Sequence, residues 1–219
     1  MNARVVPPAG PPPRTARFWN RIAPRYARSP IADEAAYARK LEMTQRHLRS
    51  HMMVLELGCG TGGTALAHSP FVRTVRATDL SEAMIAIARE KAEAAGVANV
   101  VFEVASAESV DAPAGSVDVV LAHSMLHLVD DPPALLRRIR TLLGPGGRLV
   151  ASTPCLGDVA AWLRWVEPLA SRLGLIPSLR FFTRAELEQW LAEAGFEIEE
   201  AWQPSARSGV FHVARAVGG

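Results

Sequence analysis

One stretch decides how this chain folds, and it is Val54-Leu55-Glu56-Leu57-Gly58-Cys59-Gly60-Thr61-Gly62-Gly63. The apolar run that leads into it, Met52 to Leu57, is typical of a buried β-strand. The glycines allow the backbone to turn sharply and to approach a ligand without an intervening Cβ atom. The next residues, Thr64 to His68, have a helical pattern, and the free N–H groups of a helix start would face the same point. The stretch therefore predicts a strand–turn–helix cradle for a nucleotide.

The spacing of the glycines does not decide which nucleotide binds. Gly58, Gly60 and Gly63 satisfy the G-x-G-x-x-G pattern of dinucleotide-binding proteins. Asp79 follows where a carboxylate would meet ribose hydroxyls. Glu56 argues against a dinucleotide, because a carboxylate beside the turn repels a pyrophosphate. A nucleoside with an ammonium group and no phosphate suits the site better, and S-adenosylmethionine (SAM) is such a ligand.

Two segments resemble a known family. The run from Glu56 to Gly62 closely resembles the E/D-x-G-x-G-x-G motif of class I SAM-dependent methyltransferases. Trp19, Ala23 and Tyr26 resemble the opening of the ubiquinone/menaquinone-biosynthesis methyltransferases and their small-molecule relatives. The resemblance implies SAM as the cofactor and S-adenosylhomocysteine as the product. It also implies that the N-terminal segment folds over the cofactor, with Tyr26 contacting the SAM carboxylate or sulfonium; a packing tyrosine is the alternative.

Strands and helices alternate along most of the chain, which implies an α/β fold with a parallel sheet covered on both faces. A closing antiparallel hairpin resembles the reversed final strand of class I methyltransferases. We therefore expect a Rossmann-like, doubly wound, mostly parallel seven-stranded sheet with a reversed final strand. Beyond the first strand, the predicted strands cover residues 72–78, 100–104, 117–122, 148–152, 196–202 and 209–217, and the predicted helices cover 82–95, 132–143 and 184–194.

Three parts of the chain are expected. Residues 1–13 are rich in proline and predict a disordered or extended tail, residues 14–50 an N-terminal helical lid, and residues 51–219 the methyltransferase domain. In the lid, a short helix is expected to stop near Pro24, because proline breaks helices.

Further helices are predicted within these parts. The lid is expected to continue with a second helix over residues 33–49. The domain contains an insert, residues 155–182, which is rich in Trp, Leu and Phe and predicts a helix over 158–172.

Composition limits the kind of protein. Hydrophobic residues make up 49% and charged residues 21% of the 219 positions, which is typical of a globular protein with a substantial core. No apolar run approaches the roughly 18 residues that a stable membrane span needs. Cys59 and Cys155 provide neither a disulfide framework nor metal-ligand spacing, which fits a cytoplasmic location. A monomer or a homodimer is expected.

The charge is distributed unevenly. Residues 1–50 carry +7 and residues 51–219 carry −5, for a net charge of +2. A basic front of this kind steers anions, nucleic acid or a membrane surface toward a protein. A general preference for arginine is the alternative, since the chain has 22 arginines and only 2 lysines.

The resemblance implies a set of cofactor contacts. Asp79 would bind the ribose hydroxyls, although an acid at a helix start is the alternative. Leu80 and Met84 would flank the adenine. Relatives often have an aspartate where this chain has Ser106, a weaker acceptor, so backbone groups at Ala105 and Ala107 would take part in binding the adenine amine. The complete set is Tyr26, Glu56, Gly58, Cys59, Gly60, Gly62, Asp79, Leu80, Met84, Ser106, Ala107, Glu108 and His123.

The reaction would be an in-line displacement, which needs alignment and the exclusion of water. His123 and His127 are the candidates for a general base, and a structural histidine is the alternative for each. A base is required only if the acceptor is protonated at neutral pH. Aromatic residues would line an apolar acceptor pocket, although core packing is their alternative. The expected acceptor contacts are Tyr37, Trp162, Trp165 and Phe182.

Other partners are not expected. The six histidines have no ligand spacing, so no metal site is predicted. Asp131-Pro132-Pro133 superficially resembles a motif of nucleic-acid amino-methyltransferases, but Ala134 replaces the required aromatic residue, so nucleic acid is not expected as a substrate.

The leading hypothesis is a methyltransferase acting on a small, apolar or aromatic molecule, with O- and C-methylation favoured slightly over N- and S-methylation. A SAM-binding regulatory or assembly protein without turnover is the alternative from another class. An NAD-dependent oxidoreductase is disfavoured by Glu56.

Overall fold

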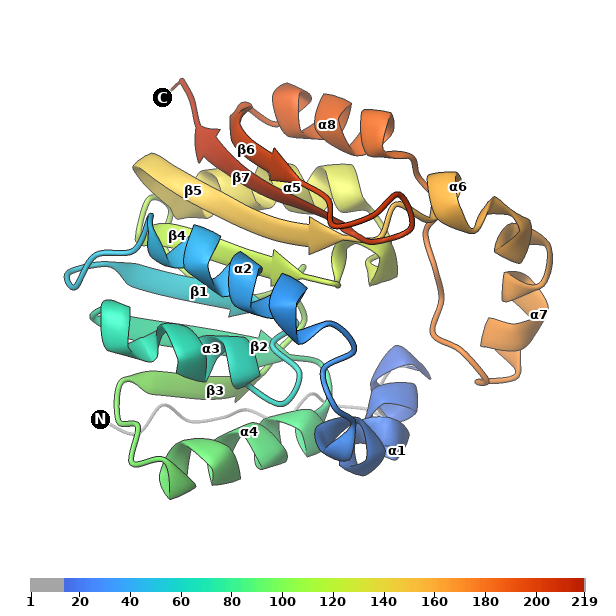
Figure 1. Cartoon of the computed structure of the whole chain (residues 1–219), viewed down its shortest axis with the longest axis horizontal. Coiled ribbons are helices and arrows are strands. Elements are labelled where there is room, and N and C mark those ends of the chain that lie inside the picture. The colour runs from blue at the N-terminus through green and yellow to red at the C-terminus, as the bar shows by residue number, and fades with distance from the viewer. Residues whose placement is uncertain (1–13, 219) are drawn as a thin grey trace.

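A computed structural model of the protein describes residues 14–218, so the tail predicted over residues 1–13 lies outside the described part. A seven-stranded sheet in the order β3-β2-β1-β4-β5-β7-β6 forms the centre of the molecule (Figure 1). Its strands are β1 (Met53–Leu57), β2 (Thr74–Asp79), β3 (Val100–Val104), β4 (Val117–His123), β5 (Leu143–Thr153), β6 (Phe196–Trp202) and β7 (Val210–Ala216). Strands β1 to β5 pair in parallel, and β7 is antiparallel to both of its neighbours. The predicted sheet with a reversed final strand is confirmed.

Helices cover both faces of the sheet (Figure 1). One apolar core unites α2, α3 and α4 with the sheet, through buried residues such as Met43, Ala65 and Ile85. A second core unites α5 and α8 with the opposite face, through residues such as Ile139 and Leu187. The helices are α1 (Arg14–Arg28), α2 (Glu34–Gln45), α3 (Gly63–His68), α4 (Glu82–Ala94), α5 (Pro132–Leu142), α6 (Leu156–Val159), α7 (Glu167–Arg172) and α8 (Arg184–Glu193). Within residues 14–218, no helix is both long enough and apolar enough to traverse a membrane.

The first helix corrects a prediction, because α1 does not stop near Pro24 but continues to Arg28. Proline removes one hydrogen bond of a helix. Pro24 is exposed, where water can replace that bond, while Ala16 and Ala23 bury the inner side of the helix.

The insert corrects another prediction, because residues 158–172 do not form one helix. They are divided among α6, a 3₁₀ turn over Ala161–Trp165 and α7. Pro168 lies in the first turn of α7, where proline is favoured because its missing N–H group is not needed there. The proline therefore starts a new helix instead of extending an old one. The insert projects from the body of the domain (Figure 1).

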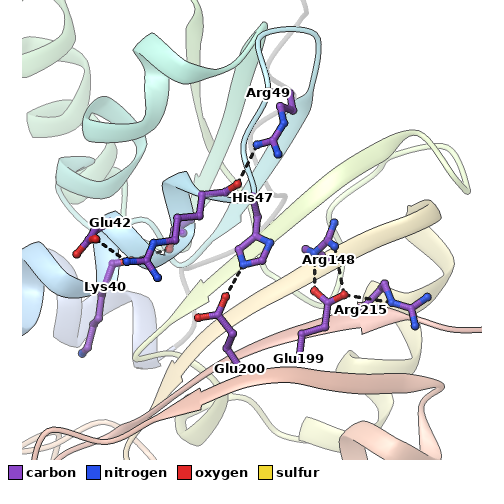
Figure 2. Close-up of polar contacts among 10 residues, drawn as sticks. Lys40, Glu42, His47, Arg49, Arg148, Glu199, Glu200 and Arg215 are labelled. Atoms are coloured by element: carbon purple, nitrogen blue, oxygen red, sulfur yellow. Dashed lines mark hydrogen bonds and ion pairs between the residues drawn. The ribbon is translucent and has the colours of Figure 1, made fainter.

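Polar contacts join the residues after α2 to the sheet and link three of its strands (Figure 2). His47, just after α2, contacts Glu200 of β6, with Nε2 and Oε1 separated by 2.7 Å. Beside it, Glu199 accepts from Arg148 of β5 at 2.7 Å and pairs with Arg215 of β7 at 3.2 Å. The His47 contact ties the residues after α2 to β6, and the Glu199 contacts join β6 to β5 and β7.

Candidate functional site

The turn after β1 requires glycine for two physical reasons. Gly58, Gly60 and Gly62 all have positive φ angles, of 67°, 53° and 79°. A Cβ atom on Gly62 would lie 2.7 Å from Phe102, so no side chain fits there. A Cβ atom on Gly60 would have only Tyr26 within 4 Å, at 3.8 Å, because a cavity borders this glycine. The turn thus presents bare backbone to the cavity.

Asp79 is held in place by the neighbouring backbone. Its Oδ2 accepts from the N–H of Gly60 at 2.9 Å, and its Oδ1 accepts from the N–H of Ser81 at 2.9 Å. Burial raises the pKa of Asp79, although the two hydrogen bonds oppose the rise. The carboxyl group therefore ties the end of β2 to the glycine turn, where it borders the cavity.

Glu56 is buried at the end of β1, and its Oε2 has no hydrogen-bond partner. Burial raises the pKa of this carboxyl to about 8, and nearby Asp79 contributes to the rise. The carboxyl is therefore mostly protonated at pH 7 unless a positive charge lies beside it. This corrects the simple expectation of a permanent negative charge, and it identifies Glu56 as an acceptor prepared for a cation.

A cavity of about 450 Å³ extends from this turn along the carboxyl ends of the strands. One end of it is lined by Asp79, the last residue of β2, and by residues that follow β2 and β3: Leu80, Met84, Ala105, Ala107 and Glu108. Its other end is lined by His127 and Leu128 together with Pro177 and Leu179 of the insert. Trp19 and Tyr26 of α1 line it as well. One cavity therefore connects an end that carries two carboxyl groups with an end lined mainly by apolar side chains.

A second cavity, of about 740 Å³, lies beneath α2. Tyr37, Lys40, Glu56, His68 and His123 line it. Lys40 donates from Nζ to the Ser152 hydroxyl at 2.9 Å, and burial lowers the pKa of this lysine. Four buried polar atoms without partners belong to residues that line this cavity, namely Glu56 Oε2, both ring nitrogens of His68 and Nδ1 of His123. Unpaired buried groups of this kind indicate a polar ligand or water.

The two candidate bases differ in their surroundings. His123 stacks on Phe211 with ring centroids 6.3 Å apart, and burial, with smaller effects of His68 and Lys40, lowers its pKa to about 3. His127 borders the first cavity, its Nδ1 has no partner, and burial lowers its pKa to about 4. Both rings are neutral at pH 7.

Two residues at the site were not predicted from the sequence. Ser124 has a φ of 53°, which is rare for a residue other than glycine, and it borders both cavities. Asn20 of α1 accepts through Oδ1 from the Ser81 hydroxyl at 2.6 Å and from the N–H of Ala83 at 3.2 Å. No sequence pattern marks Ser124. The position of Asn20 in the aromatic opening segment was the only available signal for its role.

Several predicted acceptor contacts lie elsewhere. Trp162 and Trp165 are 66% and 84% exposed and line neither cavity. Phe182 is in the apolar core, where its ring packs on Trp190 at 5.1 Å. These three aromatic residues of the insert therefore lie in the core or on the surface, whereas Pro177 and Leu179 of the insert line the first cavity. Of the predicted acceptor contacts, Tyr37 borders a cavity, the second one.

The predicted cofactor contacts mostly gather at the two cavities, but Ser106 lines neither of them. Its hydroxyl donates to the carboxylate of Glu108. Cys59 borders the second cavity and Gly62 supports the turn.

The residues present fit SAM. A turn without side chains, a carboxyl group after β2 and an unpaired acid at the end of β1 match a nucleoside with an ammonium-bearing tail. Together with the reversed β7, this arrangement defines a class I SAM-dependent methyltransferase. Among residues 14–218, no group of three or more potential metal-binding side chains is present.

Comparison with known proteins identifies the family. A protein-family model described as a methyltransferase domain matches residues 23–201, and the chain belongs to this family. The ubiquinone biosynthesis O-methyltransferase of Xanthomonas axonopodis pv. citri is 33% identical over 206 residues, which cover 87% of this chain and 83% of that protein. The enzyme of the same name from Pseudomonas aeruginosa is 31% identical over 152 residues, which cover 67% of this chain and 65% of that protein.

Solved structures share the fold. A SAM-dependent methyltransferase from Mesorhizobium loti superposes with a TM-score of 0.68 at 24% identity, covering 83% of this chain and 98% of that one. The [4+2]-cyclase SpnF superposes with a TM-score of 0.76 at 20% identity, covering 93% of this chain and 96% of that one. These likenesses concern the fold alone, and the presence of a cyclase among them shows that the fold does not fix the reaction.

Proposed function

We propose that this protein transfers the methyl group of SAM to a hydroxyl group on a small, mostly apolar acceptor. The observation that carries the proposal is the first cavity, which has a nucleoside end at Asp79, an apolar mouth at Leu179 and the unpartnered imidazole of His127 at its border. The names of the relatives, ubiquinone biosynthesis O-methyltransferases, support a hydroxyl acceptor over a carbon acceptor.

The chain offers a partner for each polar part of the cofactor. Asp79 would accept from the ribose hydroxyls, and Glu56 would pair with the ammonium group. Lys40, which borders the second cavity, would pair with the carboxylate of the amino-acid tail. Leu80 and Met84 would contact the adenine. When bound, SAM supplies an electrophilic methyl group on a good leaving group.

The residues 14–50 would act as a lid over this site. Asn20 fixes α1 to the start of α4, and Trp19 and Tyr26 border the cavity from above the glycine turn. Closing the site excludes water and fixes the acceptor in line with the transferring methyl group, an effect that contributes several kcal/mol in well-oriented reactions, up to about 7–11.

His127 would accept the proton of the acceptor hydroxyl. Its ring is neutral at pH 7, so it has a free lone pair, and it borders the apolar end of the first cavity, whereas the ring of His123 is stacked on Phe211. A positioned base of this kind contributes roughly 10²–10⁴-fold to a rate.

The test uses SAM labelled in its methyl group and a panel of small acceptors that includes aromatic alcohols and compounds with only acidic carbon positions. We expect label on oxygen of an aromatic alcohol. His127→Ala should reduce this transfer about 10²-fold or more while SAM affinity stays unchanged. Label only on carbon, or a His127→Ala variant as active as the original protein, would contradict the proposal.

A further inference from the structure

Ser124 has a backbone conformation that only glycines share with it in the described part of the chain. Its φ is 53°, and the other nine residues with positive φ within residues 14–218 are all glycines. Serine adopts this conformation at an energetic cost that glycine does not have. The N–H of Ser124 donates to the carbonyl oxygen of Ser152 at 2.6 Å, so the end of β5 holds the conformation in place. A strained residue that its surroundings fix in this way is typical of a functional position.

The same residue lies where the two cavities meet. Five residues border both cavities: Tyr26, Gly58, Gly60, His123 and Ser124. The proposed function assigns the nucleoside of SAM to the first cavity and the amino-acid tail to the second. Because the sulfur joins these two parts, the transferring methyl group belongs near this junction. In this respect the inference rests on the proposed function.

Among the side chains at the junction, that of Ser124 is available to an acceptor. The two glycines offer no side chain, and the ring of His123 is stacked on Phe211. Burial raises the pKa of Tyr26, and Asp79 adds to the rise, which indicates that this phenol lies near the carboxyl group after β2. Ser124 is exposed, and within residues 14–218 its hydroxyl has no hydrogen-bond partner. An unpaired hydroxyl therefore faces the site.

The candidate base lies one short turn further along the chain. A 3₁₀ turn covers Leu126–Leu128, and the N–H of Leu128 donates to the carbonyl oxygen of Met125 at 2.8 Å. Ser124 and His127 lie on either side of the start of this turn, and both border the first cavity. The neighbouring lining residues from this segment and from the end of β5 are apolar: Met125, Leu128, Val129 and Pro154. This part of the chain thus presents a hydroxyl and an imidazole on an apolar wall.

We propose that the hydroxyl of Ser124 donates a hydrogen bond to the attacking oxygen of the acceptor and thereby favours oxygen over sulfur as the methylated atom. The acceptor oxygen forms its bond to the methyl carbon while its proton passes to His127, and the electron pair of the broken bond stays on the sulfur of S-adenosylhomocysteine. An oxygen has a further lone pair for Ser124, and this contact fixes its orientation. A thiol sulfur is a weak acceptor, so it gains little from the same hydroxyl.

The first test measures binding without methyl transfer, by calorimetry in the presence of S-adenosylhomocysteine. The probes are 2-naphthol and naphthalene, which differ only in the hydroxyl group. Ser124→Ala should lose about fivefold in affinity for 2-naphthol, the equivalent of one neutral hydrogen bond, and should bind naphthalene like the original protein. Ser124→Gly adopts the positive φ without strain but lacks the hydroxyl, so it should show the same loss. Ser205→Ala, an exposed serine that lines neither cavity, is the matched control and should bind both probes normally.

The second test measures the choice of acceptor atom with labelled SAM. Transfer to 2-naphthol should fall about fivefold or more in kcat/KM in Ser124→Ala, whereas transfer to 2-naphthalenethiol should stay unchanged. A merely structural role would reduce transfer to both compounds alike.

Three results would overturn this inference alone, provided that the original protein methylates 2-naphthol. They are normal 2-naphthol binding in Ser124→Ala, an equal loss for 2-naphthol and naphthalene, and full 2-naphthol affinity in Ser124→Gly. An original protein that neither binds nor methylates 2-naphthol would overturn the inference together with the proposed function, so the two failures are distinguishable.

Discussion

At the scale of single residues, Glu56 has an unusual position, because its carboxyl is buried, lacks a partner for Oε2 and has a pKa raised to about 8. When no cation is bound, the protonated Glu56 side chain contributes its full stability below the ordinary pKa of a glutamate. This contribution is lost as the pH rises through about 8. A bound ammonium group favours the ionised form of Glu56 over the protonated form, because it stabilises the carboxylate. SAM binding should therefore release a proton.

The first prediction follows from this linkage. Between about pH 6 and pH 7.5, the affinity for SAM should increase with pH, by up to about tenfold per unit. Calorimetry in buffers of different ionisation enthalpy measures the proton release directly. Glu56→Gln should bind SAM more weakly and release no proton. Proton release that persists undiminished in this variant would assign the coupling to another group.

Two properties of single residues, the protonation of Glu56 and the backbone conformation of Ser124, could not be predicted from the sequence. The identity of Glu56 was recognised from its place before the glycines, but its protonation depends on burial by elements that are distant in sequence. Ser124 depends likewise on the end of β5, where its N–H donates to the carbonyl of Ser152 at 2.6 Å. Neither property is encoded in a local pattern.

At the scale of secondary-structure elements, the strand–turn–helix unit was predicted correctly because glycine spacing and apolar runs are local signals. Gly62 supports this unit by allowing Phe102 of β3 and Ala88 of α4 to approach the turn closely. The turn is therefore part of the packing between elements as well as part of the ligand site.

A substitution pair separates these two effects. Gly62 and Gly96 both have positive φ, 79° and 64°, but a Cβ on Gly62 would lie 2.7 Å from Phe102 and one on Gly96 would meet nothing within 4 Å. Gly96→Ala should lose about 1–2 kcal/mol of unfolding free energy through backbone strain. Gly62→Ala should lose about 1–3 kcal/mol more through overpacking. Urea unfolding measures both, and equal losses would show that the close contact with Phe102 is unimportant.

Asn20 tests the connection between the lid and the domain. Asn20→Ala removes the acceptor for Ser81 and Ala83, so α1 should be held less firmly over the cavity. We expect a loss in SAM affinity of about fivefold to tenfold, the equivalent of one or two hydrogen bonds. Arg25→Ala, an exposed change on the same helix, is the control. Unchanged affinity in Asn20→Ala would separate the lid from cofactor binding.

Two elements were predicted incorrectly, because their structure depends on contacts with other parts of the fold. α1 continues past Pro24 because its buried alanines pack against the domain, a gain that proline propensity does not include. The insert was expected to line a pocket because it is rich in aromatic residues. Composition cannot distinguish a buried aromatic such as Phe182 from an exposed one such as Trp165, since the difference lies in where the chain turns.

At the scale of the whole molecule, the order of strands and helices was predictable, because alternation of apolar runs with amphipathic segments implies a doubly wound sheet. The sheet brings the ends of β1, β2 and β4 to one edge, and with them Glu56, Asp79 and His123. α1 and the insert lie beside these strand ends (Figure 1). The site is therefore a consequence of topology, with its electrostatic preference set by one buried acid.

A calorimetric titration with SAM and with NAD shows whether the site prefers a cationic nucleoside to a dinucleotide. We expect SAM and S-adenosylhomocysteine to bind the original protein, NAD not to bind, and Asp79→Ala to lose SAM binding while remaining folded. Binding of NAD with an affinity equal to that of SAM, or normal SAM affinity in Asp79→Ala, would rule out this preference.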